Sequence, residues 1–337
     1  MNVDLVLDGG GVRGIALVGA LSVLEEARYE FSRIAGTSAG AVVGSLLAAG
    51  MSSRELQVAM TELDYRRFED SSRAHRVPVL GKGLSLLVGK GFYDGRYLST
   101  WLGELLASRG VRTCGDLRID DTDGSLPPSR RYRLVVTALD VSHGTLLRLP
   151  WDYHRYGLDP DKQSVVDAVR ASASVPFFFE PAQLHDARGN TSLLVDGGVV
   201  ADFPVAIFDR TDGRPPRWPT LGLKLSGRPA SEHGRLDQHR AISGPVGLGL
   251  AMLAAMRNVH EQRSLAGEEM TGRTMFIDTG SAVPRADFGI GPGARQALFL
   301  AGRRSAADFL GSHGPRLAPG VAGVVRPLSL VRTNVGA

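Results

Sequence analysis

Two short motifs near the N-terminus carry residue types suited to acyl transfer. The first is Asp8-Gly9-Gly10-Gly11-Val12-Arg13-Gly14, and the second is Gly36-Thr37-Ser38-Ala39-Gly40. In the first, backbone N–H groups without neighbouring side chains stand beside a permanent cation, Arg13, and can stabilise an anion. In the second, Ser38 has glycine two residues away on either side, the pattern of a nucleophile elbow. Anion-binding donors next to an exposed serine indicate acyl transfer through a covalent acyl-enzyme.

The first motif has other interpretations. Gly9, Gly11 and Gly14 also satisfy G-x-G-x-x-G, the fingerprint of a dinucleotide-binding turn. That fold requires an acidic residue at the end of the second strand to bind the ribose. Here the next predicted strand, Phe31–Ala35, runs directly into the serine motif without an Asp or Glu. A nucleotide-binding regulatory module and a purely structural glycine turn are the alternatives to an anion-stabilising role.

A serine hydroxyl needs an adjacent base to become a nucleophile, and Asp196 is the candidate. It follows the apolar run Leu193-Leu194-Val195 and precedes Gly197-Gly198. A carboxylate at the end of a buried strand lies where an α/β sheet places its chemistry, and burial there would raise its pKa. A plain Asp-Gly-Gly turn is the alternative. We expect the histidines after Asp196 to be exposed and non-catalytic, because no motif surrounds them: His233, His239, His260 and His313.

The three motifs, in this order, resemble those of the patatin-like phospholipases. Ala171-Ser172-Ala173-Ser174-Val175-Pro176 is similar to a further segment of that family, and Gly91-Phe92-Tyr93-Asp94-Gly95 is similar to a family turn before a helix. The resemblance implies a lipid acyl hydrolase of the phospholipase A type. It leaves the headgroup, the acyl position and the acyl chain length open.

The resemblance also implies a role for each residue identified above. Ser38 would be the nucleophile and Asp196 its base, a dyad without histidine. The backbone N–H groups of Gly10 and Gly11, with Arg13 beside them, would form the oxyanion hole. The other motif glycines would shape the turns: Gly9, Gly14, Gly36, Gly40, Gly197 and Gly198. A general carboxylesterase or thioesterase with the same site is the alternative activity.

Composition narrows the remaining classes of function. Hydrophobic residues make up 43% and charged residues 22% of the 337, as in ordinary globular proteins. The net charge of +4 is spread along the chain, so we expect no nucleic-acid partner, while weak contact with anionic membrane surfaces is compatible. No His, Cys, Asp or Glu cluster has metal-ligand spacing, so we expect no metal and no cofactor. The oligomeric state is not determined by these features.

Location follows from what the sequence lacks. There is no run of 18 apolar residues and no basic leader before the first strand, so we expect neither a transmembrane segment nor a signal peptide. The single cysteine, Cys114, excludes an internal disulfide and fits a reducing compartment, where it would be structural. We therefore expect a cytoplasmic protein.

Strand and helix patterns alternate along the chain, which predicts an α/β fold. The predicted strands are Val3–Leu7, Phe31–Ala35, Tyr132–Ala138, Leu193–Val195, Thr220–Leu225 and Met275–Asp278. The predicted helices lie near 15–27, 39–49, 53–63, 96–108, 163–173, 246–268 and 294–310. We expect three layers, α/β/α, with a largely parallel central sheet. Because strands continue past both loop-rich stretches, we expect a single domain over residues 1–337.

Three apolar features are expected to contribute to the core. They are Gly83–Gly89, Phe177–Phe179 and the helix at 246–268, which carries Leu248, Met252, Leu253 and Met256. The alternatives are a mobile lid for the first, a wall of the acyl pocket for the second and a lipid-binding stripe for the third.

Overall fold

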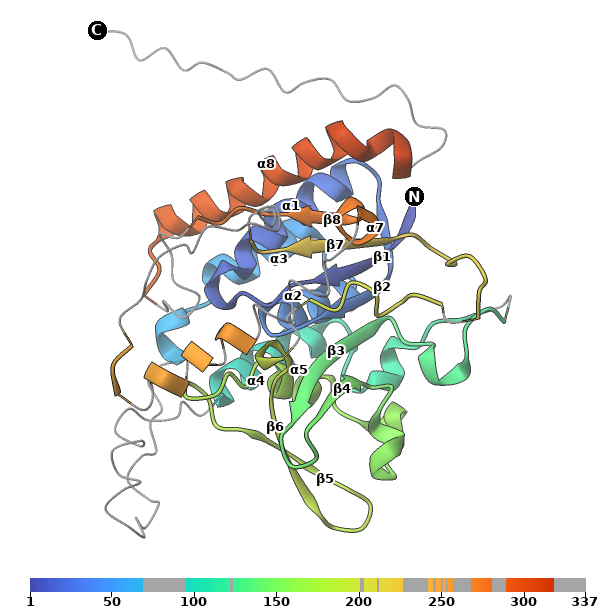
Figure 1. Cartoon of the computed structure of the whole chain (residues 1–337), viewed down its shortest axis with the longest axis vertical. Coiled ribbons are helices and arrows are strands. Elements are labelled where there is room, and N and C mark those ends of the chain that lie inside the picture. The colour runs from blue at the N-terminus through green and yellow to red at the C-terminus, as the bar shows by residue number, and fades with distance from the viewer. Residues whose placement is uncertain are drawn as a thin grey trace, which may run out of the picture.

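A computed structural model describes residues 1–68, 95–121, 124–200, 203–210, 212–226, 268–280 and 289–317, with shorter stretches between 242 and 256. These residues form an eight-stranded sheet flanked by helices (Figure 1). The strands are β1 (Asn2–Leu7), β2 (Glu30–Gly36), β3 (Leu134–Asp140), β4 (Thr145–Leu149), β5 (Ala182–His185), β6 (Thr191–Asp196), β7 (Thr220–Lys224) and β8 (Thr274–Phe276). The helices are α1 (Ile15–Glu26), α2 (Ala39–Ala48), α3 (Ser53–Glu62), α4 (Arg96–Ser108), α5 (Val165–Ser172), α7 (Glu268–Gly272) and α8 (Pro292–Leu317).

The sheet combines a parallel part with an antiparallel part. Strands β3, β2, β1, β7 and β8 are neighbours in that order and run parallel. Strands β4 and β6 pair antiparallel with β3, and β5 pairs antiparallel with β6. The α/β fold predicted from the sequence is confirmed, and the central sheet is mixed. Strands β4 and β5 were not predicted, because β5 has only four residues and neither strand shows a long alternation of apolar and polar residues.

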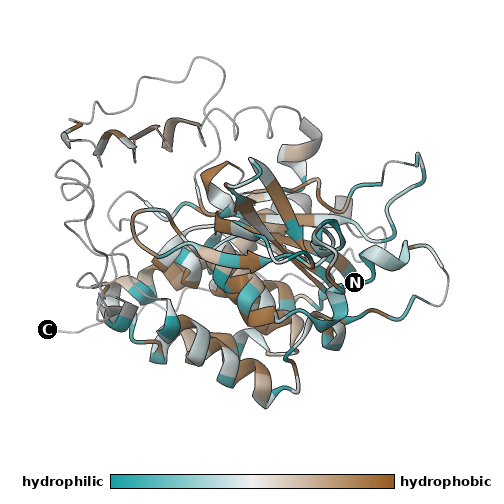
Figure 2. Cartoon of the chain, turned by 90° about the horizontal axis from the view of Figure 1, so that it is seen from below, coloured by the Kyte–Doolittle hydropathy of each residue, from teal (hydrophilic) through white to brown (hydrophobic). Residues whose placement is uncertain are grey.

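The parallel strands are covered on both faces, which explains their nearly continuous apolar sequence. In β1, every residue after Asn2 is buried. Helix α1 packs against α8, and α2 packs against β1, β2 and β3. Figure 2 shows helices along one side of the strands, which are largely brown and therefore hydrophobic. On the opposite side, the ring of Phe208 lies 4.4 Å from the Arg33 guanidinium of β2, and Phe203 and Val205 cover β7. Helices thus cover one face of the sheet, and the connecting segment that carries Phe203, Val205 and Phe208 covers the other.

The C-terminal helix closes over the first helix of the chain. A Cβ atom at Gly19 of α1 would lie 2.0 Å from the Phe299 carbonyl oxygen, and one at Gly302 of α8 would lie 1.9 Å from the Ala16 carbonyl oxygen. Glycine at both positions therefore lets the two helices touch through their backbones. Strands from both halves of the chain form one sheet, and helices from both halves pack around it. The single domain over residues 1–337 stays a prediction.

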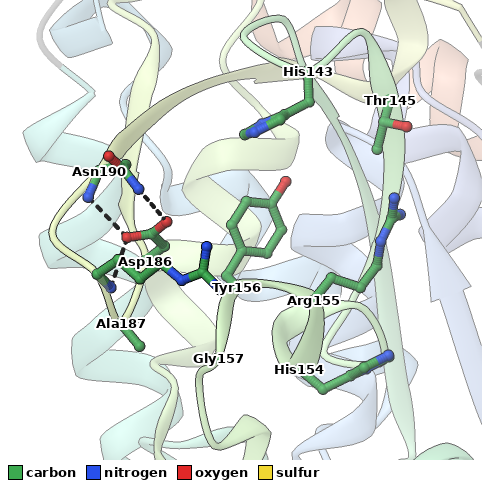
Figure 3. A pocket seen from close by; sticks show the side chains of 10 residues that line it. His143, Thr145, His154, Arg155, Tyr156, Gly157, Asp186, Ala187 and Asn190 are labelled. Atoms are coloured by element: carbon green, nitrogen blue, oxygen red, sulfur yellow. Dashed lines mark hydrogen bonds between the residues drawn. The ribbon is translucent and has the colours of Figure 1, made fainter.

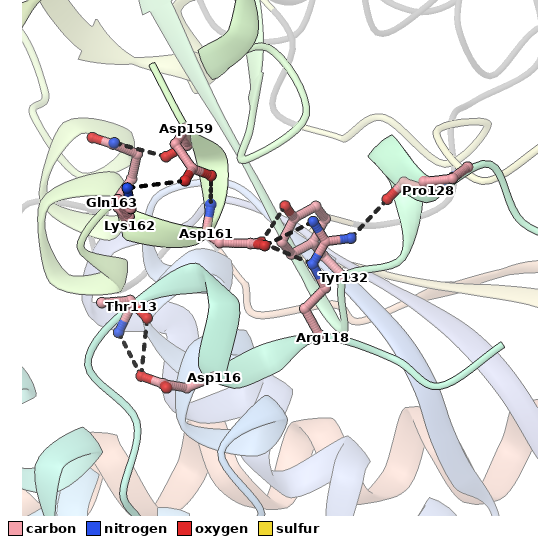
Figure 4. Close-up of polar contacts among 9 residues, drawn as sticks. All are labelled: Thr113, Asp116, Arg118, Pro128, Tyr132, Asp159, Asp161, Lys162 and Gln163. Carbon is pink, nitrogen blue, oxygen red and sulfur yellow. Dashed lines mark hydrogen bonds and ion pairs between the residues drawn. The ribbon is translucent and has the colours of Figure 1, made fainter.

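Polar contacts fasten the segment between α4 and α5 (Figure 4). Arg118 donates two hydrogen bonds to the Asp161 carboxylate, at 2.8 and 2.9 Å, and the Tyr132 hydroxyl donates a third at 2.6 Å. Cys114 is buried beside this cluster, and burial, together with Asp161 and Asp116 nearby, raises the pKa of its thiol to about 12. The thiolate is therefore disfavoured, in line with the structural role expected for this cysteine.

Across the described ranges, every helix is too short or too polar to cross a lipid bilayer.

Candidate active site

Ser38 lies between β2 and α2, in the turn predicted as a nucleophile elbow. Its backbone has φ of 53° and ψ of −120°, a conformation that is rare for residues other than glycine and costs about 1–3 kcal/mol. Only 7% of the residue is exposed. The strained turn places Ser38 at the N-terminus of α2, where the helix dipole favours developing negative charge.

Close packing requires the two glycines of the elbow. A Cβ atom at Gly36 would lie 2.3 Å from the Gly40 carbonyl oxygen, and one at Gly40 would lie 2.4 Å from the Leu7 carbonyl oxygen. Both contacts are with backbone atoms, which cannot move aside without displacing a strand or helix. Gly40 therefore seats α2 directly on the end of β1, where the glycine-rich turn begins. The predicted elbow and the predicted anion-binding turn are brought into contact.

The glycine-rich turn leaves β1 and enters a short 3₁₀ turn, Gly11–Gly14. Gly11 has a φ of 55°, in the left-handed region that favours glycine. Among the residues that the structure describes, the amides of Gly10 and Gly11 donate no hydrogen bond. Arg13 Nη1 donates at 3.3 Å to the hydroxyl of Thr279, in the segment that follows β8. Two amide donors thus lie next to the elbow, with a guanidinium anchored nearby.

Asp8, the first residue of the motif, is buried and ties β1 to β7. Its Oδ2 accepts a hydrogen bond from the Leu225 amide at 2.8 Å and lies 3.7 Å from Nζ of Lys224. Lys224 is itself 1% exposed, and its Nζ sits 5.2 Å from the centre of the Phe203 ring. A buried pair of this kind fixes geometry more than it adds stability. Sequence reasoning did not single out Lys224, although a lysine within an apolar strand is the signal for a buried carboxylate partner.

Asp196 ends β6 and is buried, as predicted for a carboxylate at the end of an apolar strand. Its Oδ1 accepts a hydrogen bond from the Gly198 amide at 2.7 Å. The strand register places Asp196 opposite Ala138 of β3. A Cβ atom at Gly197 would lie 2.6 Å from Thr137 Oγ1, so this glycine lets the turn after Asp196 settle against β3.

The C-terminal end of α5, with the residues that follow it, holds the backbones of Ser38 and Asp196 together. The Ser38 amide donates to the Ser172 hydroxyl at 3.0 Å, and the Asp196 amide donates to the Ser174 carbonyl at 2.9 Å. Both serines of this segment are fully buried. The nucleophile elbow and the end of β6 are therefore positioned by residues only two apart in sequence.

A second contact links the same two parts of the molecule. The hydroxyls of Thr37 and Thr137 lie 2.6 Å apart and form a buried hydrogen bond. Thr37 precedes Ser38, and Thr137 precedes the β3 residue that faces Asp196. None of these anchoring residues was assigned a role from the sequence, although Ser172 and Ser174 belong to the segment that carries the family resemblance.

Not every predicted residue can be placed. His233, His239 and His260 and the apolar segment Gly83–Gly89 lie outside the described residues, as do residues 91–94 of the second family segment. His313 belongs to α8. Gly95, the last residue of that family segment, packs beneath the Arg170 guanidinium. Arg170 Nη1 in turn donates a hydrogen bond to Ser174 Oγ. This turn therefore supports the same anchoring segment.

The expectation of core packing holds for part of the apolar residues. Phe179 is buried, as expected. Three apolar residues predicted on the helix at 246–268 behave differently: Leu248, Met252 and Met256 are 51%, 57% and 53% exposed. Leu253 lies outside the described residues. Assigning the three exposed residues to the core was therefore wrong, because no element in the described part of the chain covers that side of the segment.

Comparison with known proteins points to one family. The sequence matches the family described as patatin-like phospholipase over residues 5–209. A protein of Bacillus subtilis (strain 168), the uncharacterized protein YqhO, is 35% identical over 310 residues, which cover 92% of this chain and 98% of that protein.

A more distant relative and a solved structure are also similar to this chain. A cGAMP-activated phospholipase of Vibrio cholerae is 26% identical over 216 residues, covering 59% of this chain and 54% of the relative. The matched part of this chain therefore spans about half the length of that enzyme. Among solved structures, VipD from Legionella pneumophila has a TM-score of 0.50 at 17% identity, over 92% of this chain and 67% of VipD. That likeness concerns the fold alone.

Proposed function

Because the chain belongs to the patatin-like phospholipases, a family of lipid hydrolases, we propose that it cleaves acyl esters of lipids with a Ser38–Asp196 dyad. The observation that carries the proposal is the shared anchor at the C-terminal end of α5, where Ser172 and Ser174 accept hydrogen bonds from the amides of Ser38 and Asp196. Because the two anchoring residues are only two apart in sequence, they fix the backbones of Ser38 and Asp196 relative to each other, and orientation of this kind is a large part of catalysis.

Acylation follows from the roles of these groups. Ser38 Oγ attacks the ester carbonyl carbon while the Asp196 carboxylate accepts the serine proton. The carbonyl oxygen becomes an oxyanion and is stabilised by the amides of Gly10 and Gly11, with Arg13 adding positive charge. The Ser38 amide is already bonded to Ser172 and does not contribute. The tetrahedral intermediate then collapses, and the alcohol leaves with the proton held by Asp196.

Deacylation repeats the sequence with water. Asp196 accepts a proton from a water molecule as its oxygen attacks the acyl carbon. The bond to Ser38 Oγ breaks, the serine regains the proton from Asp196, and the free fatty acid leaves. The scheme uses no histidine and no metal, and it returns both residues to their starting states.

A serine-directed fluorophosphonate tests the nucleophile. Intact-mass measurement should show one adduct on the wild-type protein and on Ser45→Ala, and no adduct on Ser38→Ala. Ser45 is a suitable control because it is a buried serine of α2, the helix that Ser38 precedes, and its hydroxyl donates to the Val42 carbonyl. An adduct that persists on Ser38→Ala would remove Ser38 from the mechanism.

Substrate panels separate the two alternative functions. A lipid acyl hydrolase should prefer phospholipids, lysophospholipids or acylglycerols to short aryl esters and acyl thioesters, whereas a general carboxylesterase or thioesterase with the same site should show the reverse. Saturable binding of a labelled nucleotide would instead favour the nucleotide-binding module suggested by the glycine spacing.

A further inference from the structure

A polar cleft opens beyond Asp196, at the tips of two hairpins (Figure 3). Its volume is about 720 Å³, and it lies between the β3–β4 turn, the turn Tyr153–Tyr156 and the β5–β6 hairpin. The register of β6 places Leu194 opposite Asp140 and Asp196 opposite Ala138. The end of β3 beneath the cleft is therefore about 7 Å along the sheet from the proposed base. The residues that line the cleft have no part in the proposed hydrolysis.

The cleft has a rigid polar floor built on Asp140, which is fully buried. The Asp140 carboxylate accepts hydrogen bonds from His143 Nδ1 at 2.7 Å, from the Tyr156 hydroxyl at 2.5 Å and from the Ser142 amide at 2.8 Å. Burial would raise the pKa of Asp140, but these hydrogen bonds hold it below its usual value. Asp140 thus stays ionised and fixes the His143 ring, which stands edge-on to Tyr156 with Nε2 on the side away from the carboxylate.

The other carboxylate of the cleft is already occupied by local donors. Asp186 Oδ2 accepts from Asn190 Nδ2, and its Oδ1 accepts from the amides of Asn190 and Arg188, all at 2.8 to 2.9 Å. The side-chain bond from Asn190, together with the two amides and the positive charge of Arg188, lowers the pKa of Asp186. This carboxylate shapes the hairpin and stays ionised, so it offsets part of the positive charge of the cleft, that of Arg188 in particular.

Two guanidinium groups of the cleft, those of Arg155 and Arg188, are exposed to solvent. Within the described residues, neither guanidinium lies within 4.0 Å of a carboxylate oxygen or donates a hydrogen bond, although the charge of Arg188 acts on the nearby Asp186. Figure 3 shows Arg155 extending along β4 toward Thr145. The walls that carry the two arginines are joined, because the Ala187 amide donates to the Tyr156 carbonyl at 2.9 Å. The positive charges are therefore presented on a preformed frame.

We propose that this cleft binds a phosphate group, as a free phosphate ester or as a lipid headgroup. Arg155 and Arg188 each offer paired N–H donors that match phosphate oxygens, and His143 offers a third donor from its Nε2 when protonated. The volume exceeds that of a phosphate alone, so an ester substituent can be accommodated. The proposal does not depend on the function assigned to Ser38 and Asp196.

Calorimetric titration of the full chain tests the proposal. The Ser38→Ala protein is used, so that lipids stay intact whether or not the wild type hydrolyses them. Inorganic phosphate should bind saturably, and Arg155→Gln/Arg188→Gln should raise the Kd at least about tenfold. The matched control, Arg54→Gln/Arg304→Gln, removes two exposed arginines from α3 and α8 and should leave the Kd unchanged.

Vesicles distinguish the two sources of phosphate. If the ligand is a headgroup, phosphatidylcholine vesicles containing phosphatidic acid should retain the protein, and inorganic phosphate should compete with them. If it is a free phosphate ester, inorganic phosphate should bind, while vesicles with phosphatidic acid should retain no more protein than vesicles of phosphatidylcholine alone. The absence of saturable phosphate binding, or an equal loss in the control pair, would overturn the proposal.

Discussion

Glycines at the two ends of the β3–β6 strand pair serve different purposes. At the elbow end, a Cβ atom at Gly36, Gly40 or Gly197 would meet other atoms at 2.3 to 2.6 Å. At the hairpin end, Gly144 and Gly189 have φ of 62° and 86°, and nothing lies within 4 Å of the Cβ position. The first group lets backbones touch, while the second only reverses the chain.

The charges follow the same division. At the elbow end, Asp8 and Lys224 are both buried and face each other across β1 and β7. At the hairpin end, Arg155 and Arg188 are exposed. A close-packed centre holds reacting groups in one geometry, whereas an open rim can accept ligands of different shape. The predictions below test whether the two ends respond to substitution as differently as their packing implies.

The largest effect is expected for Asp196→Asn. The amide is nearly isosteric but cannot take up the serine proton, so turnover should fall by at least about 10³-fold while the thermal midpoint stays near wild type. Steady-state hydrolysis of a lipid ester and thermal unfolding measure the two quantities. Asp152→Asn alters another buried carboxylate, one bonded to the Arg148 amide, and should retain turnover. Full activity in Asp196→Asn would exclude the dyad.

Gly40→Ala should destabilise the fold by about 3 kcal/mol or more, because the new methyl group meets the Leu7 carbonyl at 2.4 Å. Denaturant unfolding gives the free energy of unfolding. Gly103→Ala is the matched control: this glycine is also helical, its Cβ would meet only Val166 at 3.7 Å, and alanine should stabilise by up to about 1 kcal/mol. Similar values for the two variants would mean that the elbow is not closely packed.

The hydrogen bond between Thr37 and Thr137 should couple the elbow to β3. Each single change to valine leaves a buried hydroxyl without its partner and should lower the free energy of unfolding by about 1–3 kcal/mol. The double variant should lose clearly less than the sum, which a double-mutant cycle measures. Strict additivity would show that the two hydroxyls do not interact.

The smallest effects are expected at the hairpin tips. Gly144→Ala and Gly189→Ala should each lower the free energy of unfolding by about 1 kcal/mol. Alanine is strained in the left-handed backbone conformation of these positions, but its methyl group would contact no other atom. Lipid ester turnover should not change. A loss as large as that of Gly40→Ala would remove the contrast between the two ends.

The fold class and the positions of the motifs could be predicted because their signals are local. The apolar run before Asp8 and the helical spacing after Gly14 indicate a strand that feeds a helix, and the elbow repeats that pattern. The same local reasoning missed β4 and β5, because both strands are short and most of their residues are partly or fully exposed. It also assigned Leu248, Met252 and Met256 to the core, since periodicity identifies an apolar face but not what covers it.

The sequence by itself therefore determined the glycine-rich turn, the serine elbow and the strand that ends at Asp196. Only the tertiary structure decided how they meet: β6 runs antiparallel to β3, and Ser172 and Ser174 hold the amides of Ser38 and Asp196. The physical reason is separation along the chain. Turns depend on neighbouring residues, whereas these hydrogen bonds join residues that are far apart in sequence and become neighbours only when the sheet closes.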